Sequence, residues 1–430
     1  MTPEIKKRIE QIQRGEVPEG YKKTRAGIIP AEWQEKDLSD VLKKQTKKNA
    51  DNSVNNVLTN SATRGIIRQT EYFDKQIAND ENKEGYYIVK PGYFVYNPRI
   101  SVGAPCGPFN KYYGETTGIM SPLYTVYKYA DDSQYYSEFL SYYFNSSYWH
   151  KYMYGIANYG ARSDRMNVTS DDMGSLPLPY PSLPEQKKIV EILAAQDRVI
   201  ELYQRKIDEI KKLKKICLSK MFPQKGHNAP EIRFPEFTDA WEQRKLGDEF
   251  VRVNERNGGS FGINHWISVA KMYFQAPEKV TSNNLDTRTY VMRVGDIAFE
   301  GHSNAEFEFG RFVANDIGDG IISELFPIYR HKNEYYNPYW KYAIQIERIM
   351  RPVFAKAITS SGASSNKLNE EHFLRESILV PSLAEQVKIG DYFASLDNLI
   401  TLNQRKLEEL QKSKKALMQL LLTGIVRVNV

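Results

Sequence analysis

Two stretches of the chain carry apolar residues at alternating spacings of three and four. The members of the first stretch are Ile200, Tyr203, Ile207, Ile210, Cys217 and Met221, and those of the second are Ile400, Leu407, Leu410, Leu417 and Leu421. This heptad pattern predicts two long helices, each of which pairs through one face. A lysine, Lys214 or Lys414, occupies the same place in each pattern. Because like charges would repel there, we expect either a stagger or an acidic neighbour.

Both helices belong to an internal repeat. The chain reads PSLPEQKKI from Pro181 and PSLAEQVKI from Pro381, 200 residues later, and 18 of the 35 residues in 181–215 are identical in 381–415. In each copy a serine precedes a glutamate by three residues, which is the spacing of a helix capping box. A long, regular repeat indicates that one structural unit is used twice.

The regions before the two helices are also similar, though more weakly. YYIVKPGYFVYN (86–97) matches TYVMRVGDIAFE (289–300), and both predict a strand, a glycine-centred turn and a second strand. GIMSPLYTVYK (118–128) matches GIISELFPIYR (320–330), and GARSDRMN (160–167) matches GASSNKLN (362–369). The sequence therefore predicts an α/β (α+β) fold in which two similar globular domains alternate with two long helices. The predicted boundaries are 1–24 for an N-terminal helical segment, 25–178 and 231–378 for the domains, and 181–225 and 381–424 for the helices.

Composition bounds the class of protein. At 430 residues, with 41% hydrophobic and 26% charged residues, the chain is typical of a globular protein with two or three domains. No apolar run approaches a membrane span, and the polar N-terminus does not match a signal peptide. Two cysteines exclude a disulfide framework and a four-cysteine zinc site. We therefore expect a cytoplasmic protein with no membrane contact. The net charge of +6 allows an anionic partner but does not identify one.

A search for catalytic motifs gives none. Adenine methylation would need an Asn/Asp-Pro-Pro-aromatic loop, and the nearest string, NPYW (337–340), lacks the second proline and predicts a helix start. The chain has no phosphate-binding G-x-x-x-x-G-K-[ST] loop, and its histidines have no metal-binding spacing. Cys106 has no histidine near it in the sequence, so we expect a packing role. The sequence favours a binding protein without catalytic residues, metal or cofactor of its own.

This organisation resembles the specificity subunits of type I restriction–modification enzymes over essentially the whole chain. The elements that carry the resemblance are the twin Pro-Ser-Leu-x-Glu-Gln helix openings, the Trp33/Leu38 and Trp241/Leu246 pairs, and the joining stretch that contains IRFPEFTDAWEQRKLGD. The resemblance implies that each globular domain is a target recognition domain that reads one part of a split, asymmetric DNA target. It also implies that the two helices form an antiparallel coiled coil, which sets the distance between the parts.

The same resemblance implies the partners. They are double-stranded DNA, two methyltransferase (modification) subunits that bind the helices, and ATP-dependent restriction/translocase subunits. S-adenosylmethionine, ATP and Mg are expected on those partners. Two alternatives stay open from the sequence: an enzyme with unrecognised chemistry, and a scaffold whose two globular domains bind proteins instead of DNA.

Four stretches of the first domain contain candidate DNA-binding residues. Arginine can donate two hydrogen bonds to guanine, and asparagine can pair with adenine. The candidates are Arg162, Ser163, Arg165 and Asn167 in one loop, Asn97 and Arg99 at a turn, Arg64 and Arg68 around a strand, and Lys47 in a lysine-rich run. Alternatively, the loop is a solvated surface that caps the next helix, and the lysine run is a solvated face.

The second domain offers a corresponding set. Its candidates are Ser364, Ser365, Asn366, Lys367 and Asn369 in the matching loop, and His302 and Asn304 at the matching turn. The matching loop exchanges Arg162 for Ser364 and Asp164 for Asn366, as two readers of different half-sites would. At the matching turn His302 replaces Arg99 with glutamates nearby, and a glutamate there either accepts from cytosine N4 or balances charge on the loop. The aromatic stretch 135–154 could stack on bases, but its spacing fits better a helix packed on a sheet.

Overall fold

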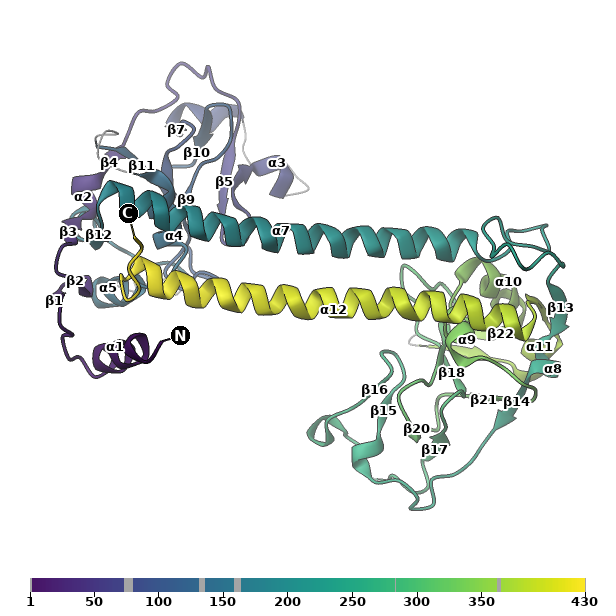
Figure 1. Ribbon diagram of the computed structural model, residues 1–430. Coiled ribbons are helices and arrows are strands. Elements are labelled where there is room, and N and C mark those ends of the chain that lie inside the picture. The colour runs from purple at the N-terminus through teal and green to yellow at the C-terminus, as the bar shows by residue number, and fades with distance from the viewer. Residues whose placement is uncertain are drawn as a thin grey trace. The chain divides into compact units, whose positions relative to one another are not determined.

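The computed structural model describes residues 2–72, 80–130, 136–157, 164–282, 284–361 and 365–429. The chain divides into two compact units. Unit 1 comprises Met1–Leu202 and Leu407–Val430, and unit 2 comprises Tyr203–Lys406. Each unit therefore contains one globular domain and one end of each long helix (Figure 1).

The two long helices are α7 (Leu183–Lys220) and α12 (Leu383–Leu422), teal and yellow in Figure 1. At about 1.5 Å per residue, each is roughly 60 Å long. Pro223 follows the end of α7, and Gly424, with φ of 70°, follows the end of α12. A proline cannot continue a helix and a left-handed glycine commonly ends one, so both stops are encoded locally. The predicted pair of long helices is confirmed.

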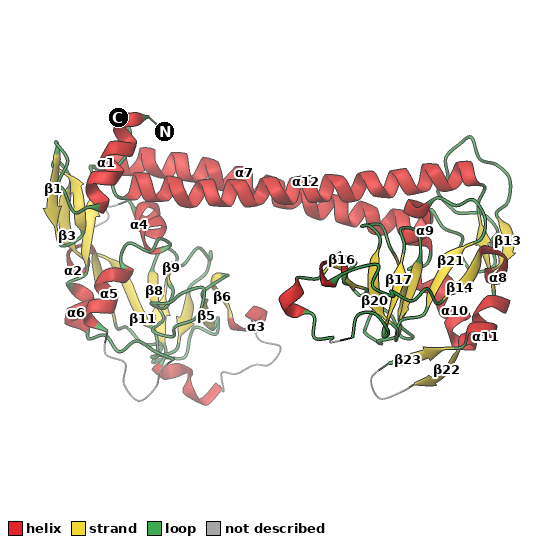
Figure 2. Ribbon diagram, turned by 90° about the horizontal axis from the view of Figure 1, so that it is seen from below, coloured by secondary structure: helices red, strands yellow, loops and turns green. Residues whose placement is uncertain are grey.

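The domain of unit 1 is built on a four-stranded antiparallel sheet. The strand order is β4-β11-β8-β9, with Val126 of β11 facing Gln45 on one side and Val95 on the other. The strands are β4 (Leu42–Gln45), β11 (Thr125–Tyr129), β8 (Phe94–Tyr96) and β9 (Phe109–Lys111). The helices of this domain are α2 (Leu38–Val41), α3 (Gln69–Tyr72), α4 (Ser137–Phe144), α5 (His150–Ile156) and α6 (Ser170–Gly174), and α1 (Pro3–Gln13) precedes it (Figure 2).

The domain of unit 2 repeats this topology. Its four-stranded sheet has the order β14-β21-β18-β19, the counterpart of the first sheet strand for strand. The strands are β14 (Phe250–Val253), β21 (Ile328–His331), β18 (Ile297–Glu300) and β19 (Arg311–Ala314). The helices are α8 (Leu246–Glu249), α9 (Asn337–Ala343), α10 (Glu347–Ala357) and α11 (Glu370–Arg375). The NPYW string lies in the first turn of α9, as expected.

Two-stranded antiparallel pairs complete both domains. In unit 1 they are β1 (Tyr21–Thr24) with β2 (Gly27–Pro30), β3 (Gln34–Asp37) with β12 (Pro177–Tyr180), β5 (Leu58–Ser61) with β6 (Gly65–Arg68), and β7 (Tyr87–Val89) with β10 (Gly118–Met120). In unit 2 they are β13 (Glu242–Lys245) with β24 (Ser377–Val380), β15 (Ile267–Ser268) with β16 (Tyr273–Phe274), β17 (Thr289–Met292) with β20 (Gly320–Ser323), and β22 (Ile358–Ser361) with β23 (Asn366–Leu368).

The strands on either side of the central glycine do not pair with each other. The predicted strand–turn–strand segments are β7 and β8 around Gly92, and β17 and β18 around Gly295. Both glycines have positive φ, 85° and 91°. β8 and β18 nevertheless join the four-stranded sheets, whereas β7 and β17 pair with β10 and β20. The local pattern predicts each strand but not its partners, which are other strands later in the chain or before it.

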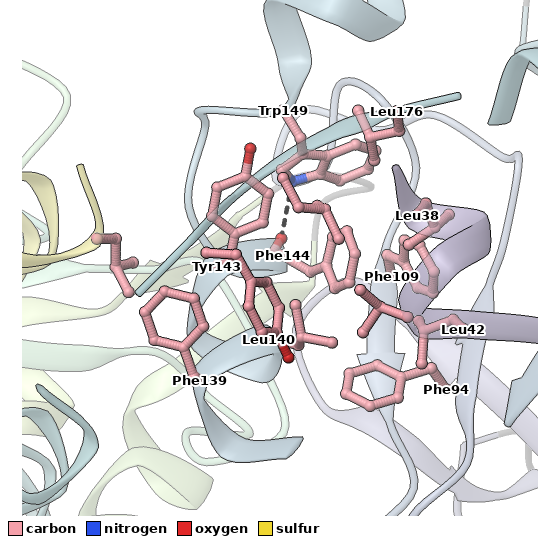
Figure 3. Packing of buried hydrophobic residues seen from close by; sticks show 14 of the residues in the cluster. Leu38, Leu42, Phe94, Phe109, Phe139, Leu140, Tyr143, Phe144, Trp149 and Leu176 are labelled. Carbon is pink, nitrogen blue, oxygen red and sulfur yellow. Dashed lines mark hydrogen bonds between the residues drawn. The ribbon is translucent and has the colours of Figure 1, made fainter. Parts of the chain in front are cut away.

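Aromatic side chains form the core of unit 1 (Figure 3). Phe109 stacks on Phe144 with ring centroids 4.0 Å apart, and Trp149 donates its indole N–H to the carbonyl of Phe144 at 3.0 Å. Phe139 and Tyr143 are buried in the same cluster. The described part of the 135–154 stretch therefore packs in the core, as its spacing predicted. Cys106 is also fully buried there.

Candidate nucleic-acid interface

The glutamate of each repeated helix opening forms an ion pair with an arginine that lies beyond a helix end. Glu385 accepts two hydrogen bonds from Arg233, both at 2.7 Å, and Glu185 accepts from Nε of Arg427 at 2.7 Å. Both carboxylates are almost fully buried. The glutamate half of the predicted capping box is therefore wrong, because the carboxylates neutralise arginines instead. The serine half is present at Ser382, whose Oγ accepts from the N–H of Glu385 at 3.4 Å.

The glutamine that follows each glutamate holds a domain helix. Oε1 of Gln186 accepts from the backbone N–H of Tyr136, and Oε1 of Gln386 accepts from that of Tyr336, both at 3.3 Å. These tyrosines are the N-caps of α4 and α9. Since the first N–H groups of a helix lack partners within it, this contact satisfies one donor and fixes the domain to the long helix.

A third repeated residue binds both a lysine and a tyrosine. Asp397 lies 2.5 Å from Nζ of Lys214 and accepts from the hydroxyl of Tyr342, and Asp197 contacts Lys414 and the hydroxyl of Tyr142 in the same way. Burial and the neighbouring carboxylate raise the pKa of both tyrosines. The acidic neighbour expected beside Lys214 and Lys414 is therefore present in both units.

The apolar residues of the two heptad patterns, which we call the seam, are buried or half-buried along both helices. Ile207, Leu407 and Cys217 are buried, and the half-buried members are Ile200, Tyr203, Ile210, Ile400, Leu410 and Leu417. Within unit 1, Gln196 of α7 donates to the carbonyl of Leu410 of α12 at 3.3 Å, and within unit 2, Sγ of Cys217 lies 3.4 Å from the hydroxyl of Tyr392. In each unit the two helix ends run antiparallel.

In unit 1 the structure brings two of the predicted DNA-binding stretches together. Arg99 and Arg165 form an isolated antiparallel bridge, flanked by backbone hydrogen bonds of 3.0 Å from Ile100 to Asp164 and from Met166 to Pro98. The Arg99 guanidinium lies 3.7 Å from the Asp164 carboxylate, and both side chains are at least half exposed. These residues, with Asn97 two residues before Arg99, form what we call the first tip: 97–99 and 164–167.

The hairpin β5–β6 is fastened to this tip. Asn97 donates from Nδ2 to the carbonyl of Asn60 in β5 at 3.1 Å. The hairpin carries Arg64, whose guanidinium donates to the carbonyl of Glu71 at 2.8 Å, and the exposed Arg68. Lys47 is exposed beyond β4, and its carbonyl accepts from Ile88. Lys47 therefore lies next to β7.

A hollow lies beside the first tip. It has a volume of about 380 Å³, and its lining includes Tyr96, Pro98, Tyr127, Met166 and Asn167. Burial raises the pKa of Tyr127. The hollow has an aromatic and thioether floor and a polar rim, and the exposed Asn167 belongs to that rim.

In the second tip (300–304 with 365–367) the two segments are also joined by a backbone hydrogen bond. Asn366 donates its backbone N–H to the carbonyl of Gly301 at 2.9 Å and its side-chain amide to Ser303 Oγ at 3.0 Å. His302 and Lys367 are exposed. Asn304 Oδ1 accepts from the N–H groups of Glu306 and Phe307, so this asparagine shapes the turn. Ser365 is half-buried beside Gly301.

Asn369 has a structural role that the sequence comparison did not indicate. Its side chain is the N-cap of α11 and accepts from the N–H of His372 at 2.9 Å. In unit 1 the equivalent cap, of α6, is Thr169 and not Asn167. The match of Asn167 with Asn369 in the sequence therefore does not hold in space. Arg162, Ser163 and Ser364 lie outside the described residues.

Sequence reasoning missed four residues that hold the domains to the helices, namely Arg233, Arg427, Tyr142 and Tyr342. The tyrosines could have been found, because Tyr142 and Tyr342 are also 200 residues apart, like the helix openings. The arginines follow the helix ends at different distances, so no constant spacing reveals them. Nothing in the described part of the chain groups three or more histidine, cysteine or acidic side chains in a metal-binding arrangement.

Comparison with known proteins agrees with this construction. The family described as "Type I restriction modification DNA specificity domain" matches residues 30–212 and 323–412, which is more than half of the chain. The chain belongs to this family. The role of a specificity subunit, which recognises DNA and is not itself an enzyme, is thereby confirmed.

Individual relatives from this specificity-domain family match the chain over different lengths. The MjaX specificity subunit, assigned to a type I restriction enzyme of Methanocaldococcus jannaschii, is 26% identical over 96% of this chain and 97% of its own length. The MjaVIII specificity subunit of the same organism is 24% identical over 59% of this chain and 63% of its own length.

Solved structures share the fold. The HsdS subunit from Thermoanaerobacter tengcongensis aligns over 96% of this chain and 98% of its own, with a TM-score of 0.50 and 16% identity. A chain of a type I R-M system aligns over 93% and 99%, with a TM-score of 0.56 and 14% identity. Among the residues that the structure describes, no helix of this specificity subunit is long and apolar enough to cross a membrane.

Proposed function

We propose that this chain binds a bipartite, asymmetric DNA target, with one half read by each globular domain. One observation carries the proposal: both domains have the same strand order and the same attachment to the helices, yet their tips differ in chemistry. Arg99 and Asp164 stand at the first tip, where the second has His302 and Asn366. Two domains of the same architecture with different polar side chains at their tips support two different half-sites.

Within each domain, polar side chains at and next to the tip are the proposed readers. In unit 1 they are Arg99, Arg165, Asn97 and Asn167, together with Arg162 and Ser163 of the same loop. In unit 2 they are His302, Asn304, Ser365, Asn366 and Lys367, with Ser364 of the same loop and Asn369. Arg64, Arg68 and Lys47 are proposed contacts to the DNA backbone or bases, and their exposure supports that role.

The long helices are proposed to set the distance between the half-sites and to bind the modification subunits. Exposed apolar residues recur at the same places on both helices: Val199 and Leu202 on α7, and Leu399 and Leu402 on α12. Leu202 and Leu402 are 62% and 50% exposed, and each is followed by an exposed Gln-Arg-Lys triplet. Two equal surfaces support two copies of one partner.

The remaining partners follow from this assignment. The two modification subunits would bind S-adenosylmethionine, and restriction/translocase subunits would bind ATP and Mg. The chain with the TM-score of 0.56 comes from a structure concerned with complex assembly of a type I R-M system, which supports such an assembly here.

Exchange of one recognition domain tests the proposal. Residues 25–178 are replaced by the same domain of a relative, and methylated adenines are mapped in a host that also expresses the modification subunits. We expect one half of the target to change while the other half stays the same. A change in both halves would contradict the proposal that each domain reads one half. An affinity for DNA without the steep salt dependence typical of DNA binding would favour the alternative, a protein-binding scaffold.

A further inference from the structure

Glu300 places a carboxylate at the second tip in an almost fully buried position. Its side chain is 7% exposed and lies at the end of β18. Oε1 accepts from the backbone N–H of His302 at 3.1 Å and also contacts Nδ1 of the His302 ring. A buried carboxylate is unfavourable unless it is well hydrogen-bonded. These contacts therefore indicate that Glu300 has a specific role at His302.

Unit 1 shows which part of this arrangement the fold itself requires. At the equivalent strand end, Asn97 Oδ1 accepts from the backbone N–H of Arg99 at 3.0 Å. An amide therefore suffices to hold the N–H two residues later. Unit 2 differs in that the holding group is an acid and also contacts the side chain of the residue that it holds. The ring contact is thus an addition to a common frame.

The contact determines what His302 presents to a ligand. A carboxylate can only accept hydrogen bonds, so Nδ1 carries a hydrogen, and whenever the ring is neutral Nε2 is the acceptor. The side chain of His302 is 62% exposed. The turn beneath it has no spare room, since a Cβ atom on Gly301 would lie 2.3 Å from the carbonyl oxygen of Asn366. The backbone that carries the ring is therefore packed closely against the backbone of Asn366.

We propose that Glu300 is a positioning residue that presents Nε2 of His302 as a hydrogen-bond acceptor to the second half-site. An acceptor matches bases that display an exocyclic amino group in the major groove, namely N6 of adenine or N4 of cytosine. Guanine O6 and thymine O4 would place an acceptor against an acceptor at that edge. This inference rests on the proposed function, because it requires that unit 2 reads DNA.

Base-substitution affinities test the contact. The wild-type target is first determined by in vitro selection with the full chain and its modification subunits. Affinities are then measured for every single substitution in both half-sites. At one position of the second half-site we expect the wild type to prefer adenine or cytosine by about tenfold. His302→Ala and Glu300→Ala should lose this preference. Glu300→Gln should keep it, since its amide oxygen still accepts from Nδ1.

A spectroscopic readout separates positioning from simple stability. Nitrogen-15 spectra of the histidine rings should show the proton of His302 on Nδ1 in the wild type and in Glu300→Gln, and a mixture of tautomers in Glu300→Ala. His227→Ala, at an exposed position outside both domains, is the matched control and should change neither readout.

Three results are decisive. Retention of full selectivity by His302→Ala at every position of the second half-site would overturn the proposal, and so would a wild-type ring with its proton on Nε2. In both cases selectivity for the first half-site would show that the proposed function still stands. Absence of any sequence preference in the wild type would refute the proposed function itself.

Discussion

The ammonium group of Lys214 on α7 lies 2.5 Å from Oδ1 of Asp397 on α12, within unit 2. The other carboxylate oxygen accepts from the hydroxyl of Tyr342 on α9, and Lys214 also lies over the Tyr342 ring, 4.9 Å from its centroid. One acid thus joins both long helices to the globular domain. Lys414, Asp197 and Tyr142 form the same cluster in unit 1.

Asp397→Asn should destabilise unit 2. The change leaves Lys214, whose side chain is 21% exposed, without a carboxylate. Because the pair is partly exposed, we expect the free energy of unfolding to fall by about 1–2 kcal/mol, less than for a fully buried pair. Chemical denaturation measures the change. Glu408→Gln, at an exposed position on the same helix, is the control and should have no effect. An equal loss in both variants would mean that the cluster adds no stability.

Arg233→Ala should destabilise the protein more than Arg427→Ala. Each leaves a buried glutamate without its arginine, for an expected loss of about 2–4 kcal/mol. Glu185 would still accept from the indole N–H of Trp33 at 2.9 Å. The equivalent Trp241 indole nitrogen has no partner among the described residues, so Glu385 would keep less support. Thermal denaturation compares the variants. The double variant Arg233→Ala/Glu385→Gln should recover part of the loss, and equal losses in the single variants would contradict the role of Trp33.

The stability of unit 2 should fall as the pH drops below about 6.5. Burial among Phe250, Tyr335 and Trp340 lowers the pKa of His331 to about 3 from an ordinary value of 6.5. Between these values the unfolded chain binds a proton that the folded chain does not bind. Stability should therefore decrease toward pH 3 by at most about 1.4 kcal/mol per pH unit.

His331→Phe removes this titrating group and keeps an aromatic ring at the position. We expect the variant to lose less stability than the wild type between pH 7 and pH 5, as measured by denaturation at each pH. His227→Phe is the control, because His227 is exposed and its replacement should leave the pH dependence unchanged. Parallel pH curves for the wild type and His331→Phe would show that His331 does not titrate as described.

Arg162 and Lys47 should affect DNA binding in different ways. If Arg162 donates two hydrogen bonds to guanine, Arg162→Ala should cost about 1–3 kcal/mol and relax selectivity at one position. If Lys47 contacts a phosphate, Lys47→Ala should weaken binding to all sequences alike and lower the salt slope by about one. Affinities for the specific target and a scrambled one, at several salt concentrations, separate the two. An Arg162→Ala protein that behaves like the wild type on both would remove that residue from the interface.

Adding one heptad to both long helices should lengthen the DNA spacer. Insertions after Glu209 and after the equivalent Glu409 add about 10 Å to each helix and nearly preserve the seam. At about 3.4 Å per base pair, the spacer should grow by up to about three pairs. The bases read in each half-site should not change. Methylation maps of the parent, the double insertion and the insertion after Glu209 alone make the comparison. An active double insertion with the parental spacer would contradict a spacing role for the helices.

Local features of the sequence predicted the frame of the molecule better than its long-range contacts. The helices follow from apolar spacing and from stop signals at Pro223 and Gly424, which act within one or two turns. The capping glutamates failed as a prediction because arginines from distant segments bind them more strongly. The pattern around Gly92 also did not predict that β7 and β8 pair with other strands and not with each other.

The candidate readers show the same limit. Residue type and position at a turn singled out Arg99 and Arg165 separately, but their pairing depends on segments more than sixty residues apart in the sequence. Glu300 was not a candidate, because a glutamate at the end of a strand is ordinarily a solvated residue. Its role is visible only where its carboxylate meets the His302 ring.

The side chains that hold each domain come from both sides of the joint. On the helix side they are Gln186 and Asp197, or Gln386 and Asp397, and on the domain side Tyr136 and Tyr142, or Tyr336 and Tyr342. A genetic crossover inside the repeated stretch joins halves that already match. Such an event replaces a whole reading unit and leaves the joint intact, so a new target can arise in one recombination step without passing through a chain that fails to fold.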